Sequence, residues 1–81
     1  MDWEWVYTGP EGREDRFTIK LRRAIRNGVC VGVSLTLTDR PHDGDENETK
    51  DVFKSVREAF DITGPLCADL RAEGWELKPS E

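Results

Sequence analysis

The chain has 81 residues, of which 36% are charged and 36% hydrophobic, and its formal net charge is −5. This length suits one two-layer core, so we expect a single domain over residues 1–81. No apolar run approaches the roughly 20 residues that span a bilayer, and residues 1–4 lack the features of a signal peptide. Two cysteines do not make a disulfide framework. The composition therefore argues against a membrane protein and favours a reducing cytoplasm.

The charge is unevenly distributed along the chain. Residues 1–40 contain seven Lys or Arg and six Asp or Glu, whereas residues 41–81 contain five and eleven. Phosphate contacts supply much of the affinity for nucleic acid, so an acidic chain is a poor general binder of it. We therefore rank nucleic acid below protein as a partner without excluding it.

Residues 2–8 alternate as a half-buried strand requires, with two tryptophans and a tyrosine on one side. The glycines and proline of residues 9–12 predict a turn into a second strand. Pairing Trp5 with Ile19 keeps the large side chains of both strands on one face. We expect the aromatic residues to belong to the core, and the alternative is a stacking platform for single-stranded nucleic acid.

Residues 17–21 and 29–37 alternate in the same way and predict the second and third strands of an antiparallel meander. The third strand, followed to residue 38, has no charged residue and no proline, so it is a poor free edge. Something should pair with its outer side. Residues 75–78 are the candidate within the chain, and a second copy of residues 29–38 would make a homodimer.

The hairpin between these two strands allows two registers. A two-residue turn at Asn27-Gly28 pairs Leu21 with Ser34, which puts the apolar sides of the strands on opposite faces. A three-residue loop that begins one residue earlier pairs Leu21 with Val33 and restores a common face. We expect the three-residue loop, with Gly28 in the left-handed conformation.

The opposite face of the predicted sheet is polar and partly basic, and it is a candidate binding surface. Its central residues are Lys20, Arg22, Ser34 and Thr36. In some DNA-binding domains such a sheet enters the major groove, which makes nucleic acid the alternative function. The simpler interpretation is an ordinary solvated face, and the acidic second half of the chain supports it.

Residues 39–48 form a polar loop with a second candidate surface, which would act by mimicking an acidic ligand. The acids of this surface are Asp43, Asp45, Glu46 and Glu48. Their spacing does not fit a calcium-binding loop and His42 has no partner histidine or cysteine nearby, so we predict no metal site. We expect these acids to precede a helix, whose N-terminus favours negative charge.

From residue 48 or 49 the apolar residues follow a helical period. Gly64-Pro65 predicts the end of this helix and the start of a second, which Gly74 ends. Residues 75–78 alternate again and predict a short strand. The expected fold is therefore α+β, a three-stranded antiparallel meander followed by two helices packed on one face and a short C-terminal fourth strand (β-β-β-α-α-β).

Residues 72–77, AEGWEL, resemble the helix-to-strand junction of the DUF4177-like small bacterial proteins. The match covers about a tenth of the chain, and the order of elements in that family differs from the order predicted here. The resemblance implies a glycine that stops a helix and a tryptophan and leucine that anchor the next strand. It implies no activity.

The sequence contains no phosphate-binding glycine loop, no paired-cysteine zinc motif and no nucleophile elbow. A Cys–His pair would need His42 with Cys30 or Cys67, and the pattern fixes neither cysteine beside it. We therefore expect no enzyme and no cofactor. By elimination we expect a small acidic protein-binding module of the inhibitor, immunity or adaptor type, bacterial or phage in origin. The alternatives are a nucleic-acid-binding domain and a structural domain that self-associates.

Overall fold

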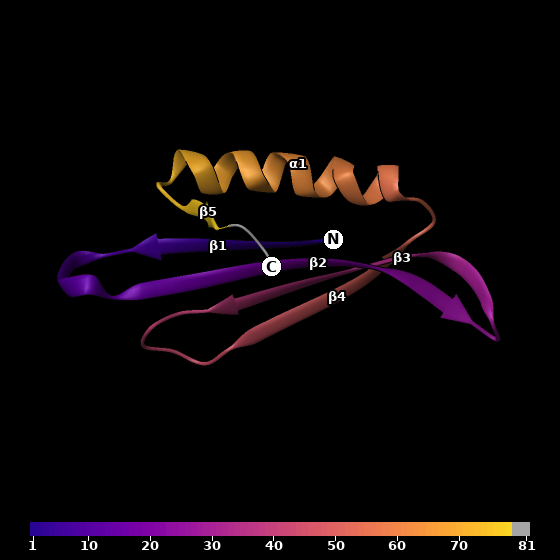
Figure 1. The fold of residues 1–81 in the computed structure, drawn as a ribbon, viewed down its shortest axis with the longest axis horizontal. Coiled ribbons are helices and arrows are strands. Elements are labelled where there is room, and N and C mark those ends of the chain that lie inside the picture. Colours follow the sequence, from indigo (N-terminus) through magenta and orange to yellow (C-terminus); the bar gives the residue numbers. More distant parts are fainter. Residues whose placement is uncertain (79–81) are drawn as a thin grey trace.

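The computed structural model describes residues 1–78 and has two layers, an antiparallel sheet and a long helix packed on one of its faces (Figure 1). The sheet has five strands in the order β4-β3-β2-β1-β5. The elements in chain order are β1 (Asp2–Thr8), the short 3-10 turn η1 (Pro10–Gly12), β2 (Glu14–Arg26), β3 (Val29–Arg40), β4 (Asn47–Phe53), α1 (Val56–Ala72) and β5 (Glu76–Lys78). The predicted β-β-β-α-α-β order is therefore wrong, because the described residues form five strands and one α-helix.

β4 occupies the segment that was predicted to open the first helix. It pairs antiparallel with residues 33–39 of β3. The apolar residues from 52 onward had a helical spacing because they combine Phe53, the last residue of β4, with Val56, the first residue of α1. The main-chain groups on the outer edge of β3 need hydrogen-bond partners, and β4 supplies them. β4 therefore occupies most of the edge through which residues 29–38 were expected to pair in a homodimer. The unpaired edge that suggested such a dimer is largely absent.

α1 is one continuous helix of 17 residues rather than the two that were predicted. Ser55 is its N-cap, and the Ser55 hydroxyl accepts a hydrogen bond from the backbone N–H of Glu58 at 3.3 Å. Pro65 lies inside the helix, where a proline costs about 3 kcal/mol. The helix continues because its inward stripe runs unbroken past the proline, and burial of that stripe outweighs the cost. The stripe consists of Ala59, Thr63, Leu66, Cys67 and Leu70.

Gly74 ends the helix, as predicted. Its φ is 97°, its N–H donates to the Arg71 carbonyl at 3.2 Å, and the Trp75 N–H donates to the Leu70 carbonyl at 3.0 Å. This arrangement is a Schellman motif, and it turns the chain back toward the sheet. β5 then pairs with β1. The short C-terminal strand is thus confirmed, but its suggested place beside the third strand is wrong.

The hairpin between β2 and β3 has the two-residue turn that the sequence argument rejected. Asn27 and Gly28 have φ values of 53° and 76°, as a type I′ turn requires. A β-bulge leaves Val31 without a partner and shifts the register by one residue, so Leu21 faces Leu35. The three-residue loop is therefore wrong. The extra residue that restores a common apolar face lies in the strand and not in the turn.

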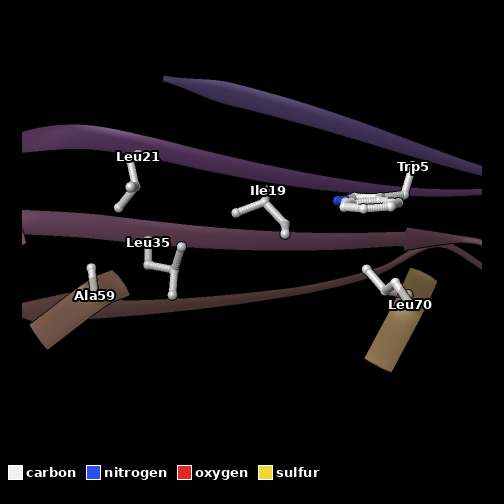
Figure 2. Packing of buried hydrophobic residues seen from close by; sticks show 6 residues of the cluster. All are labelled: Trp5, Ile19, Leu21, Leu35, Ala59 and Leu70. Carbon is white, nitrogen blue, oxygen red and sulfur yellow. The ribbon is translucent and has the colours of Figure 1, made fainter. Parts of the chain in front are cut away.

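The core lies between α1 and the sheet (Figure 2). Its largest fully buried side chains are Trp5, Ile19 and Leu35. Trp5 is 1% exposed, which confirms that it belongs to the core and not to a stacking platform. It pairs with Phe17 rather than with Ile19, and this shift of two residues leaves every side chain on its predicted face.

Candidate functional site

The four predicted residues of the sheet surface lie together on the face that α1 leaves uncovered, which we call the open face. Lys20 lies opposite Thr36, and Arg22 lies opposite Ser34. β4 widens this surface by placing Lys50 opposite Thr36 on the other side. Ser34 is nearly buried between its neighbours, so the accessible groups here are the two lysines, the arginine and the threonine.

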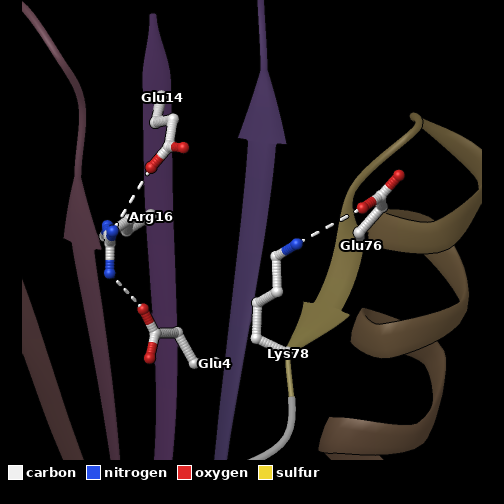
Figure 3. Close-up of polar contacts among 5 residues, drawn as sticks. All are labelled: Glu4, Glu14, Arg16, Glu76 and Lys78. Carbon is white, nitrogen blue, oxygen red and sulfur yellow. Dashed lines mark hydrogen bonds and ion pairs between the residues drawn. The ribbon is translucent and has the colours of Figure 1, made fainter. Parts of the chain in front are cut away.

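Acidic side chains neutralise the part of the open face that β1 and the start of β2 form. Arg22 binds both carboxylate oxygens of Asp2, with Nη2 3.0 Å from Oδ2. This hydrogen bonding lowers the pKa of Asp2 and raises the pKa of Arg22. Arg16 binds Glu4 at 2.6 Å and Glu14 at 3.2 Å (Figure 3). This region is a set of ion pairs rather than a free basic surface, which weakens it as a site for phosphate groups.

The four predicted acids of the loop are exposed and lie in two elements. Three of them lie between β3 and β4 and the fourth belongs to β4: Asp43, Asp45, Glu46 and Glu48. Arg40 Nε donates to Glu46 Oε1 at 2.7 Å, and Asp43 lies 3.7 Å from His42 Nε2. A strand and not a helix follows the loop, so the expectation that these acids face a helix N-terminus is wrong.

His42 lines a pocket of about 350 Å³ at the end of the sheet where η1 meets the loop between β3 and β4. Its Nδ1 lies 2.7 Å from Asp15 Oδ1, and its backbone N–H donates to the same oxygen at 2.8 Å. These bonds lower the pKa of Asp15. Among residues 1–78, neither a serine nor a cysteine lines this pocket, since Cys30 lies at the hairpin end of β3 and Cys67 lies in α1. The Cys–His pair that the sequence allowed is therefore not assembled.

The β2–β3 hairpin projects beyond the helix and the neighbouring strands, and we call residues 22–32 the arm (Figure 1). The β1 ladder ends where Leu21 pairs with Met1, and the β4 ladder ends where Phe53 faces Val33. A helix of 17 residues spans about 26 Å and a strand of 13 residues about 43 Å, so α1 is too short to cover β2. Apart from Gly32, which the chain leaving β4 contacts, the arm is therefore a two-stranded ribbon whose faces no other helix or strand of residues 1–78 covers.

The arm exposes large apolar side chains on both faces. Ile25 is 65% exposed, Val29 62% and Val31 49%. Cross-strand partners share a face, so the two-residue turn puts Val29 beside Arg26 and Cys30 beside Ile25. Single exposed apolar residues are ordinary, but three within one short ribbon give it an unusual amount of exposed apolar surface, a feature typical of interaction sites.

The arm belongs to the basic hairpin of an acidic molecule. Residues 16–38 contain no Asp or Glu, and their basic residues are Arg16, Lys20, Arg22, Arg23 and Arg26. The rest of the chain has seven Lys or Arg and all 17 acidic residues. The net charge of −5 thus divides into a positive hairpin and a strongly negative remainder.

Sequence reasoning missed the arm as a site, although two signals pointed toward it. One is the acid-free run of residues 16–38. The other is the capping-box pattern formed by Ser55 and Glu58, which marks the start of the helix. In the structure Glu58 Oε2 also accepts from the backbone N–H of Lys54 at 3.0 Å. A helix that begins after this capping box leaves residues 47–53 to form a strand, and it is shorter than the predicted helical region.

Comparison with known proteins gives no match to a family model, a curated protein or a solved structure. The resemblance of residues 72–77 to a bacterial family is thus confined to the local helix-to-strand junction. Within residues 1–78, no helix is long and apolar enough to cross a membrane. In the same residues, no group of three or more His, Cys, Asp or Glu is placed to hold a metal ion. The surfaces of the chain itself are therefore the basis for inferring its function.

Proposed function

We propose that this protein is a non-catalytic protein-binding module whose contact surface is the arm. The observation that carries the proposal is the exposure of Ile25, Val29 and Val31 in a ribbon that no other helix or strand of residues 1–78 covers. Val52, at the end of β4 beside the arm, is 60% exposed and extends the patch. Exposed apolar area of this kind is retained in small domains where a partner buries it.

The charge of the arm supports a partner with an acidic surface. Arg23 and Arg26 are exposed, and the arm itself contains no carboxylate. Arginine is favoured at protein interfaces because its planar guanidinium binds carboxylates with two parallel hydrogen bonds. The predicted acidic loop supports an interface less well, because Arg40 already binds Glu46 and Glu48 lies apart in β4.

Two further features support a non-catalytic protein of a reducing cytoplasm. The pocket beside the His42–Asp15 pair is lined by neither serine nor cysteine among the described residues. Both cysteines are free thiols, and Cys30 is exposed on the arm. An exposed thiol at a binding surface persists where the compartment keeps it reduced.

Nucleic-acid binding is the second candidate, and the acid-free basic run of residues 16–38 favours it. A two-stranded ribbon fits the major groove of DNA, and the arm has this form. Against this candidate stand the ion pairs of Arg16 and Arg22 and the negative charge on the rest of the molecule. Phosphate binding depends on free cations, so the arm favours a protein partner.

A capture experiment with matched variants tests the proposal. Tagged wild-type protein, R23E/R26E and K54E/R57E are each used to retain proteins from cells of the source organism. Both variants exchange two exposed basic residues for acidic ones, but only the first lies on the arm. We expect the wild type and K54E/R57E to retain the same proteins and R23E/R26E to lose them. Equal retention by all three would contradict the arm as the contact, and loss on nuclease treatment would favour nucleic acid.

A further inference from the structure

We propose that the partner contributes an extended acidic segment that adds as a β-strand to the outer edge of β2 at Arg23 and Ile25, beyond the Met1–Leu21 pair. This inference rests on the proposed function and specifies how the arm binds. Strand addition satisfies unpaired main-chain groups at a sheet edge, and side chains then select the sequence that is added.

The edge of β2 presents free main-chain groups at the right place. The Leu21 N–H donates to the Met1 carbonyl at 2.8 Å, and the Met1 amine donates to the Leu21 carbonyl at 3.0 Å. Main-chain groups of successive residues in an antiparallel strand point to alternate sides. Arg23 and Ile25 therefore direct their N–H and C=O groups to the same side as Leu21, beyond the end of β1, while the residue between them faces β3.

The edge of β3 within the arm is a poorer site. The bulge at Val31 interrupts the regular ladder, and bulges are a common device against pairing at sheet edges. At Gly32 the chain that leaves β4 passes so close that a β-carbon would collide with the Phe53 carbonyl oxygen. The regular and unobstructed edge of the arm is the one on β2.

Charge selects an acidic strand rather than a second copy of this chain. Antiparallel pairing of two β2 edges across a two-fold axis would bring Arg22, Arg23 and Arg26 of each copy together. Like charges on neighbouring strands are destabilising. A segment that alternates Glu or Asp with apolar residues instead places carboxylates beside Arg26 on one face, and its apolar residues can pack against Ile25, which lies on the opposite face and is 65% exposed.

Synthetic peptides test this mode of binding directly. The probe is an eight-residue peptide of alternating Glu and Val with blocked ends, added to labelled protein at neutral pH. Its controls are a Lys and Val peptide of the same length and a Glu and Val peptide with N-methyl groups on alternate residues. We expect the acidic peptide to shift the amide resonances of residues 22–26 and to slow hydrogen exchange at Arg23 and Ile25. N-methylation should weaken binding by about tenfold or more, because it removes the main-chain donors without changing charge.

A proline variant separates this inference from the proposed function. In Ile25→Pro the lost N–H faces the open edge, so the β2–β3 ladder keeps its hydrogen bonds. We expect Ile25→Pro to lose both the peptide and the proteins captured by the wild type. If Ile25→Pro captures them normally while R23E/R26E does not, strand addition is wrong and the proposed function stands. Equal binding of the N-methylated peptide, or shifts centred outside the arm, would also overturn strand addition. If the peptide binds as expected but R23E/R26E captures the wild-type proteins, the proposed function is the part that fails.

Discussion

Strands β2 and β3 pass through two environments within one molecule. Under the helix, Ile19 and Leu35 are 0% and 2% exposed, whereas in the arm Ile25 and Val31 are 65% and 49% exposed. We call the helix-covered part the body. The residue types and the hairpin are the same in both regions, and the difference lies in what packs against them (Figure 1).

This difference shows that alternation of apolar and polar residues predicts a strand but does not predict whether the strand is buried. A strand rises about 3.3 Å per residue and a helix about 1.5 Å, so a helix must have more than twice as many residues to cover a strand. α1 has 17 residues and β2 has 13, so about 17 Å of the strand extends past its cover. Stability should therefore come from the body, and the arm is left available for contact with other molecules.

The largest expected effect compares one residue from each region. Trp5→Ala should lower the free energy of unfolding by about 3–5 kcal/mol, because it empties the largest site in the body. Ile25→Ala should change it by no more than about 0.5 kcal/mol, because the arm side chain is exposed. Denaturant unfolding followed by circular dichroism measures both. Similar losses in the two variants would contradict the division into body and arm.

A smaller effect is expected at Gly32, where the arm joins the body. Gly32→Ala should cost about 1–3 kcal/mol, because its β-carbon would collide with the Phe53 carbonyl and displace the end of β4. Gly9→Ala is the matched control, since an added β-carbon there meets no atom closer than 3.8 Å. Chemical denaturation of the two variants would decide the point, and equal stability would mean that β4 does not hold this position.

At the tip of the arm, Gly28→Ala should cost about 1 kcal/mol, because Gly28 has a φ of 76° that alanine adopts poorly. Asn27→Gly serves as a control, since Asn27 has a φ of 53° and glycine adopts this φ without strain. Amide resonances should show the change confined to residues near the turn. A Gly28→Ala protein as stable as the wild type would argue against the type I′ turn.

The smallest effect concerns acid, at the end of the body farthest from the arm. Hydrogen bonds from His42 lower the pKa of Asp15 in the folded chain. The folded state then binds fewer protons than the unfolded state, so the stabilisation is complete above about pH 4 and is lost as pH falls through the lowered pKa. In Asp15→Asn the decline in unfolding free energy below that pH should be shallower. Identical pH profiles for the two proteins would show that this contact does not stabilise the fold.

Burial patterns allowed part of this fold to be predicted from the sequence. β1, β2 and β3 each carry large residues on one face, and Gly74 lies where only a residue tolerant of positive φ ends a helix well. β4 offered no such pattern, since six of its seven residues are exposed. An edge strand of this kind is specified by the unpaired main-chain groups of its neighbour, which sequence periodicity does not report.

The candidate site was predictable only in part, for a similar reason. The phase of the strands placed Lys20 and Thr36 on one face, and the structure pairs them. Exposure of the arm depends on how far β1 extends along β2, β4 along β3, and α1 over both strands. The bulge at Val31 arises because a two-residue turn and a common apolar face require different registers, and the strand absorbs the mismatch.

Native-state hydrogen exchange, read residue by residue, tests the division between body and arm most directly. In the body, amides of paired strands should exchange only at the free energy of global unfolding. In the arm, the amides of Arg23 and Ile25 should exchange rapidly, while those of Arg22 and Ala24, which face β3, should be better protected. Protection of Arg23 and Ile25 equal to that of Arg22 and Ala24 in the isolated protein would mean that the β2 edge is already covered, and would contradict a free binding arm.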